Sequence, residues 1–457
     1  MNAVIILITS VLPFFCLRAF RGGQSGKLSN PLLHKGIILS VVLLCLCLSA
    51  TVDGAELRGY VQPEVRLGLK DDHRIGQVGN PLARLEVTSW LGSDAAASMI
   101  SDLYIDNLSN DQHISAGYDL REAYVDLYLG PVDLRFGKQI FAWGKADELN
   151  PTDNLNPSSF SDPTRSKSDR KIGILALKSG LNIMDFTLEL VAIPTFVSSE
   201  LPESGSGWEF FGAPPGAEIP KPVYPENKIE NSELGVRLLR SIRNVDLSLS
   251  YFDGWDDIFT PKIRPVAVPY SDPQLSGISI TTKYYRTKVI GADFATAISD
   301  FGLWGETAYF ITEDRDGNNP EIKNPYFQFV IGADYSFEPR VKLNLQYLQE
   351  IITKIDDDSE RETEENNISR MGAGPLFTKA ISTRIAKEFG DAPHTLELAG
   401  IYDIENKGYV LKPQLTLSPL DGVSCYLGLN IFGGDSESLF GKFSKNNEAY
   451  FRVKYSF

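Results

Sequence analysis

The stretch YDLREAYVDLYLGPVDLRFGKQIFAWGKADELNPTDNLNP, residues 118–157, predicts a tight hairpin followed by an ordered loop. Its first half alternates apolar and polar residues with a period of two, and the alternation resumes after Gly130-Pro131. That period is typical of a β-strand with one apolar face. The apolar set comprises Ala123, Val125, Leu127, Leu129, Leu134, Phe136 and Ile140. We therefore expect two antiparallel strands with one apolar and one polar face.

The polar face of this hairpin carries the first candidate functional residues. A two-residue turn at 130–131 sets Asp126 opposite Arg135. Counting back along both strands sets Glu122 opposite Gln139, so the polar sets meet without a slip of register. Two interpretations of the Asp126–Arg135 pair are open. It braces the wall as a salt bridge, or it belongs to a ring of charges that sorts solutes, as in porin constrictions.

Similar alternating segments recur from Leu57 to the end of the chain, and they number about 18, with 16 as the alternative. Short connections are predicted at 92–95, 130–131, 179–182, 243–244, 299–300, 338–339, 390–393 and 419–422. Longer polar connections come mostly between them, as at 143–169, 194–231, 254–281 and 353–375. This sorting predicts an all-β fold, a transmembrane antiparallel up-and-down β-barrel with short periplasmic turns and long external loops.

The N-terminal residues 1–55 resemble a leader. Apolar runs cover 4–17 and 37–50, and the second follows Lys35 and precedes small residues, as in a secretory signal. We therefore expect a leader or signal peptide over 1–55 and a single outer-membrane barrel domain over 56–457. A cleaved signal would export the protein to the outer membrane of a Gram-negative-type cell.

The chain ends in EAYFRVKYSF, an alternating strand whose apolar residues reach the last position. A terminal aromatic strand of this form resembles the signal by which the barrel-assembly machinery takes up outer-membrane proteins. The residues of the assembly signal are Phe451, Val453, Tyr455 and Phe457. The expected partners are this machinery, outer-membrane lipid with lipopolysaccharide, and small solutes.

Part of the opening stretch resembles a bacterial outer-membrane family known only as a domain of unknown function, number thirteen-zero-two. The resemblance rests on RFGKQ at 135–139, Trp143-Gly144, Asp147, Asn150-Pro151, Asp153-Asn154 and Asn156-Pro157. Lys138 stands where the family usually has arginine. The match is dense over residues 118–157, and beyond them only 291–293, 305–306 and Tyr309 match. The resemblance implies a barrel and supplies no substrate.

Composition excludes several classes of function. The chain has 44 Lys and Arg against 59 Asp and Glu, so it lacks the basic surface that a nucleic-acid partner needs. Of the four cysteines, only Cys425 lies beyond the leader, so we expect no intrachain disulfide. The four histidines are scattered without ligand spacing, and we predict neither a metal nor a cofactor.

The loop after Trp143, which includes Asp147, is rich in Asn-Pro and Asp-Asn pairs. These residues build turns through side-chain bonds to the backbone. A loop so dense in turn formers is expected to fold into the barrel mouth as a constriction. An ordered external cap is the alternative.

A second candidate pair lies across the turn at 299–300, which sets Asp293 opposite Glu306. Like charges directly opposed on a sheet are unfavourable, so a basic partner is expected. Conceivable donors are Arg237, Lys288 and the 165–170 segment. Such a partner would make the pair a docking point for an inward loop. Otherwise the two carboxylates are screened by water in a wide pore.

We therefore predict a porin-like outer-membrane channel that passes small solutes through a polar lumen. The lumen and constriction candidates are Glu122, Asp126, Arg135, Gln139, Trp143, Asp147, Asp293 and Glu306. One alternative is a barrel that serves as sheath or scaffold for a partner, such as a cytochrome or an export component. A hydrolase is a weaker alternative, because His113 and Ser115 lack a third partner. We predict no catalytic residues and no enzymatic activity.

Overall fold

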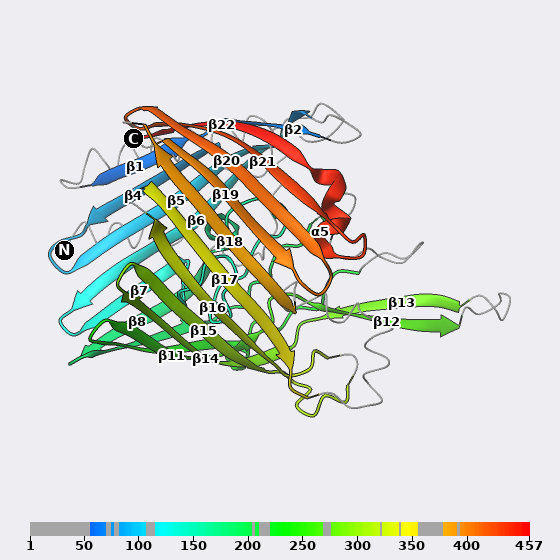
Figure 1. Ribbon diagram of the computed structural model, residues 1–457. Coiled ribbons are helices and arrows are strands. Elements are labelled where there is room, and N and C mark those ends of the chain that lie inside the picture. The colour runs from blue at the N-terminus through cyan, green and yellow to red at the C-terminus, as the bar shows by residue number, and fades with distance from the viewer. Residues whose placement is uncertain are drawn as a thin grey trace.

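The computed structural model describes residues 55–69, 75–76, 82–106, 115–202, 206–209, 220–267, 276–319, 322–337, 340–354, 378–390 and 394–457. The predicted leader, apart from residue 55, lies outside the described residues, as does His113. In the described part, the strands form one closed antiparallel barrel, as the sequence predicted (Figure 1). Its wall has 18 strand positions, which we call staves; one stave is a single strand or a strand divided by a break.

The first stave consists of β1 (Glu56–Val61) and β2 (Glu64–Gly68), with the short β3 (Ile75–Gly76) beside β2. Pro63 has no backbone N–H to donate, which accounts for the break between β1 and β2. The other staves are β4 (Ala83–Trp90), β5 (Ala95–Asp106), β6 (Ser115–Leu129), β7 (Val132–Gln139), β8 (Ile174–Ile183), β9 (Phe186–Ile193), β10 (Glu233–Ile242), β11 (Val245–Trp255), β14 (Arg286–Ile298), β15 (Phe301–Ile311), β16 (Tyr326–Phe337), β17 (Val341–Ile352), β18 (Lys379–Phe389), β19 (His394–Asp403), β20 (Gly408–Leu420), β21 (Val423–Gly434) and β22 (Glu448–Ser456).

The two ends of the chain close the barrel. β1 pairs with β4 on one side and with β22 on the other. Gly59 and the terminal Phe457 exchange two backbone hydrogen bonds of 3.0 Å. A side chain at Gly59 would collide with the Phe457 ring and the Arg84 carbonyl, so glycine permits this close approach. No strand edge of the sheet is left open at this seam.

One predicted turn is wrong. The residues of the expected turn at 179–182 continue the ladder of β8, and the chain reverses two residues later at Met184-Asp185. Met184 adopts the left-handed conformation there, with φ of 51°. Leu181 and Ile183 extend the alternation of β8, so the pattern favoured a longer strand over the turn chemistry of Asn182.

The alternating segment 282–298 does not form one strand as its pattern predicts, because it is divided at Tyr284-Tyr285. β13 (Ser276–Lys283) pairs with β12 (Thr260–Ala267), and the two form a ribbon separate from the barrel sheet, largely within the predicted loop 254–281. Figure 1 shows this ribbon projecting from the end of the barrel that bears the long connections. The short turns lie at the opposite end.

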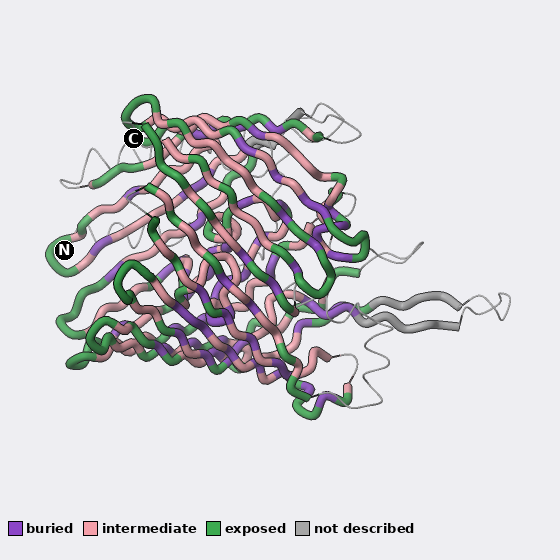
Figure 2. Tube along the Cα trace, in the orientation of Figure 1, coloured by how far each residue is buried: buried purple, intermediate pink, exposed green. Residues whose placement is uncertain are grey.

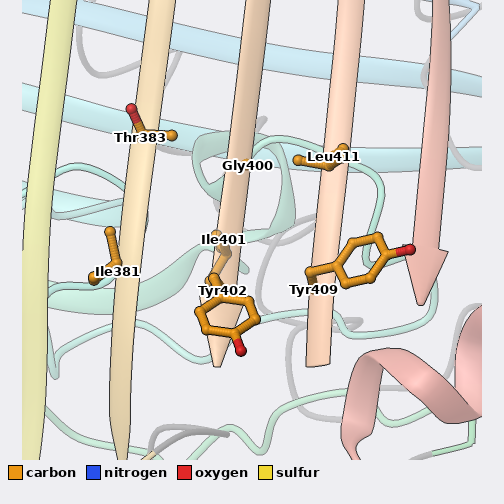
Figure 3. A pocket seen from close by; sticks show the side chains of 7 residues that line it. All are labelled: Ile381, Thr383, Gly400, Ile401, Tyr402, Tyr409 and Leu411. Atoms are coloured by element: carbon orange, nitrogen blue, oxygen red, sulfur yellow. The ribbon is translucent and has the colours of Figure 1, made fainter. Parts of the chain in front are cut away.

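The outer surface of the barrel is rich in apolar side chains. Outward residues more than one third exposed include Leu177, Leu190, Leu249, Ile290, Ile331, Leu345, Leu398, Leu411 and Leu427. A shallow groove of about 310 Å³ lies on this face around Gly400, between Ile381, Tyr402 and Tyr409 (Figure 3). Among the described residues, no helix is long and apolar enough to cross a membrane. Figure 2 shows that the strand ends at the short turns are mostly exposed.

Candidate functional site

The connection between β7 and β8, residues 140–173, runs inside the barrel, and we call it the plug segment (Figure 1). It contributes Phe141, Trp143 and Leu155 to a buried apolar cluster. The wall residues of this cluster are Ile174, Ala176, Val191, Ile193, Phe252, Val289, Ala308, Phe310 and Tyr326. The lumen is therefore not polar throughout, which corrects the sequence-based prediction.

The plug segment enters the lumen through a bend with the indole of Trp143 against β10. A Cβ atom built at Gly235 on β10 would lie 2.9 Å from the Trp143 ring and 2.8 Å from Leu155. The missing side chain of Gly235 thus makes room for both. Gly144 follows in the left-handed region, with φ of 86°, where other residues are strained. Trp143 is 4% exposed, so it packs within the site and does not line an open path.

Side chains of the plug segment hold its own backbone. Asn156 accepts a hydrogen bond from the Phe141 amide at 2.7 Å and donates to the carbonyls of Gln139 and Ile172. Asn150 donates to the Trp143 carbonyl at 2.9 Å. The asparagines of the Asn-Pro pairs thus do what the sequence analysis expected of turn formers, and they do it inside the barrel.

Glu306 on β15 is the main anchor of the plug segment on one wall. Its carboxylate accepts hydrogen bonds from the backbone amides of Lys145 and Ala146, and from the Thr152 hydroxyl at 2.9 Å. The side chain is 3% exposed. Several donors on one carboxylate make these charge-assisted bonds strong. Glu306 therefore docks an inward loop.

Asp293 lies opposite Glu306 on the neighbouring strand, as predicted, but has separate partners. Arg237 on β10 donates to its carboxylate at 3.1 Å, and the Ser248 hydroxyl also donates to it. Arg237 is thus the basic partner among the candidates, while Lys288 pairs with Asp253 instead. The two buried carboxylates each have their own donors, which relieves their repulsion.

Asp147 joins the plug segment to β17 and β18. Its backbone amide donates to the Gln346 side chain at 2.8 Å, and that side chain donates back to the Asp147 carbonyl at 2.7 Å. Its carboxylate lies 3.3 Å from Arg384. The sequence analysis did not single out Gln346, which is buried and also binds Trp304 and Ser382. Its only sequence signal was a polar position on an alternating strand.

The candidate residues of the β6–β7 hairpin lie close to the start of the plug segment. Arg135 donates two hydrogen bonds to Asp126, at 2.7 and 3.0 Å, and stacks over the Tyr124 ring at 3.9 Å. Glu122 accepts from the Ile140 amide at 2.7 Å, where the plug segment begins. Gln139 is 1% exposed and donates to the Ala176 carbonyl, so it braces the wall and lines no path.

The opposite wall holds the plug segment with arginines that the sequence analysis missed. Arg66 on β2 contacts Asp162 at 3.1 Å, together with Glu64 and Glu448 at 2.5 and 3.2 Å. Burial alone would raise the pKa of Asp162, but Arg66 and Thr164 bring it below its ordinary value. Each such arginine occupies one polar position on an alternating strand, and that position alone does not reveal its partner.

Two further arginines, on β4 and β6, hold the next part of the plug segment. Arg84 binds Asp102 and also reaches Asp169 at 3.0 Å. Arg121 donates to the backbone carbonyls of Ser168 and Asp169. These bonds reach α3 (Lys167–Arg170), the short helix of the plug segment. The plug segment therefore spans the lumen from β15 and β17 to β2, β4 and β6.

A second apolar cluster lies in the lumen, near the barrel end that bears the long connections. Helix α5 (Leu439–Lys442) and the following η3 (Phe443–Asn446) pack Phe440 and Phe443 against Phe432 on β21. The indole of Trp208 lies edge-on to Phe432 and Phe443, at ring distances of 5.3 and 5.2 Å. Phe160 of the plug segment packs against this cluster. In the described part of the chain, no group of three or more His, Cys, Asp or Glu could hold a metal ion.

Comparison with known proteins finds solved structures of outer-membrane proteins at low sequence identity. No family model matches the chain, and no curated protein matches it. OmpT, an outer membrane protein of Vibrio cholerae, is 10% identical over 88% of this chain and 97% of that chain, with a TM-score of 0.41. Salmonella typhi OmpF, in complex with daunomycin, has the same identity and coverages and a TM-score of 0.42. A triple mutant of the Rhodopseudomonas blastica porin is 13% identical over 88% and 100% of the two chains, with a TM-score of 0.39.

Proposed function

We propose that the protein is an outer-membrane channel that passes small solutes, in the manner of a porin, through a lumen restricted by the plug segment. The observation that carries this proposal is the attachment of the plug segment to opposite walls, through Glu306 on one side and Arg66 on the other. Charged and polar groups at such a constriction select what passes. The proposal assigns no catalysis to the chain.

The outer surface supports a place in the membrane. Its apolar middle is flanked by aromatic rings at the strand ends near the short turns, as in the girdles of outer-membrane barrels. These exposed aromatic residues are Trp90, Tyr128, Phe301, Phe337, Phe389, Tyr455 and Phe457. Phe451, Tyr455 and Phe457 on this face also suit the proposed recognition by the barrel-assembly machinery.

Planar-bilayer recording of the purified protein tests the channel. We expect discrete conductance steps that are small for an 18-stave barrel, because the plug segment occupies the lumen. The alternative, a sheath or scaffold for a cytochrome or export component, predicts no steps and constant co-purification of one partner. No conductance steps together with constant co-purification of one partner would contradict the channel proposal. The plug segment favours the channel, since it occupies the space in which a partner would lie.

Trypsin on intact cells tests the orientation. Lys228 lies in the long connection between β9 and β10, and Arg243 lies in the short turn between β10 and β11, both exposed. We expect cleavage after Lys228 in intact cells, because the long connections face outward. Arg243 should be cleaved only after the outer membrane is opened. Cleavage at Arg243 in intact cells would contradict the orientation.

A further inference from the structure

Three cations with few anionic partners lie between the plug segment and β20, and we call them the cation group: Arg165, Arg170 and Lys412. In the part of the chain that the structure describes, Lys412 donates only to the Thr164 carbonyl, at 3.4 Å. Arg165 donates to the Tyr104 hydroxyl and the Asp169 carbonyl, at 3.1 and 2.7 Å. These acceptors are uncharged. Within the described residues, neither Arg165 nor Lys412 forms an ion pair.

Arg170 has one carboxylate within reach, that of Glu148 at 3.5 Å. In the described part of the chain, the Nε atoms of Arg170 and Arg165 are buried and find no hydrogen-bond partner. Burial lowers the pKa of Arg170, Glu148 and Asp162 oppose this, and Arg165 adds to the lowering. An arginine nevertheless stays protonated in a protein. The positive charge of Arg170 is therefore only partly balanced.

The other carboxylates of this region already have partners. Asp162 accepts from Arg66 and from the Thr164 amide and hydroxyl. Glu64 and Glu448 also bind Arg66. Asp162 and Asp169 also lie near the cation group, but they form their ion pairs with Arg66 and Arg84. Among the described residues, Glu148 is thus the one carboxylate that forms an ion pair with a member of the group.

Three other arginines of the lumen are paired closely with carboxylates. Arg84 makes two bonds to Asp102, Arg237 contacts Asp293, and Arg66 has three carboxylates. Removing a charge from water without giving it a partner is strongly unfavourable. The cation group departs from the pattern of its surroundings, and a bound anion would restore it.

We propose that the cation group binds a small oxyanion of the carboxylate or phosphate class. Guanidinium groups bind both through paired N–H donors, and the Lys412 ammonium supplies a further donor. This inference rests on the proposed channel and deepens it, because the cation group lies where the plug segment meets the wall. The solutes that pass this constriction would then be anionic.

Thermal unfolding of the purified protein in detergent tests the site with two probes, inorganic phosphate and succinate. Each is titrated against chloride at constant ionic strength and at pH 7. We expect a saturable rise in unfolding temperature with at least one probe, and the responding probe identifies the class. Arg170→Gln and Lys412→Gln should each weaken the apparent affinity about tenfold, the loss of one charge-assisted bond.

The matched control is Lys178→Gln, which removes a lumenal lysine that already contacts Glu189 at 2.9 Å. It should leave the oxyanion effect unchanged. If Arg170→Gln does not fold, Lys412→Gln alone decides the outcome. No saturable effect of either probe, or equal losses in all the variants, overturns the site.

The failure of the site and that of the channel can be told apart. Oxyanion binding by a protein that gives no conductance steps would support the proposed site and contradict the proposed channel. Conductance steps without a saturable oxyanion effect would contradict the proposed site and support the proposed channel.

Discussion

Replacing Arg66 with methionine is expected to destabilise the folded barrel by about 3–5 kcal/mol, the range for breaking a buried ion pair. Arg66 is 4% exposed and has three carboxylates within 3.2 Å, from Glu64, Asp162 and Glu448. Without the guanidinium, these carboxylates stay buried with too little positive charge around them. Urea unfolding in detergent measures the loss in unfolding free energy. The folded fraction is read from the heat-dependent shift in gel mobility.

Arg58→Met is the matched control on the same stave. Its salt bridge to Glu56 is exposed, with side-chain exposures of 69% and 58%, so we expect a loss below about 1 kcal/mol. Adding Asp162→Asn to Arg66→Met should recover part of the stability, because one buried charge is removed. Equal losses for the Arg66 and Arg58 variants would show that Arg66 does not hold the plug segment to its wall.

Replacing Glu306 with alanine is expected to raise the single-channel conductance several-fold. The change leaves the amides of Lys145 and Ala146 and the hydroxyl of Thr152 without their shared acceptor. Hydrogen bonds to a charged group contribute about 1.5–3 kcal/mol each, so this end of the plug segment should be held only through Asp147 and move away from β15. Asp293 keeps Arg237 and Ser248, so the wall itself should persist.

Glu189→Ala controls for the loss of a lumenal carboxylate. Glu189 contacts Lys178, and within the described residues it forms no ion pair with the plug segment. Its removal should leave the conductance within about twofold of the original, since this partly buried pair joins two neighbouring wall strands and holds no part of the constriction. If both variants conduct alike, Glu306 does not anchor the constriction.

Local alternation was enough to predict the strands and much of their register. The pairs Asp126–Arg135 and Asp293–Glu306 follow from counting across two-residue turns, and both occur as expected. Neighbouring strands that share a tight turn have little freedom of register. The turn at Met184 was placed too early in the sequence, because the alternation on both sides of it fits more than one turn position.

The partners of the plug segment could not be predicted in this way. Asp162 meets Arg66 from 96 positions away, and Asp147 meets Gln346 from 199 positions away. No local pattern encodes such contacts, because they depend on how the closed barrel places opposite walls. The Asn-Pro pairs predicted an ordered, inward loop, but they did not indicate where it would dock.

The central claim is that the plug segment sets the size of the passage. Planar-bilayer recording of the intact protein beside a variant whose residues 145–170 are replaced by a short Gly-Ser linker tests it most directly. The account predicts small conductance steps for the intact protein and steps several times larger for the variant. Steps of equal size in the two proteins would contradict it.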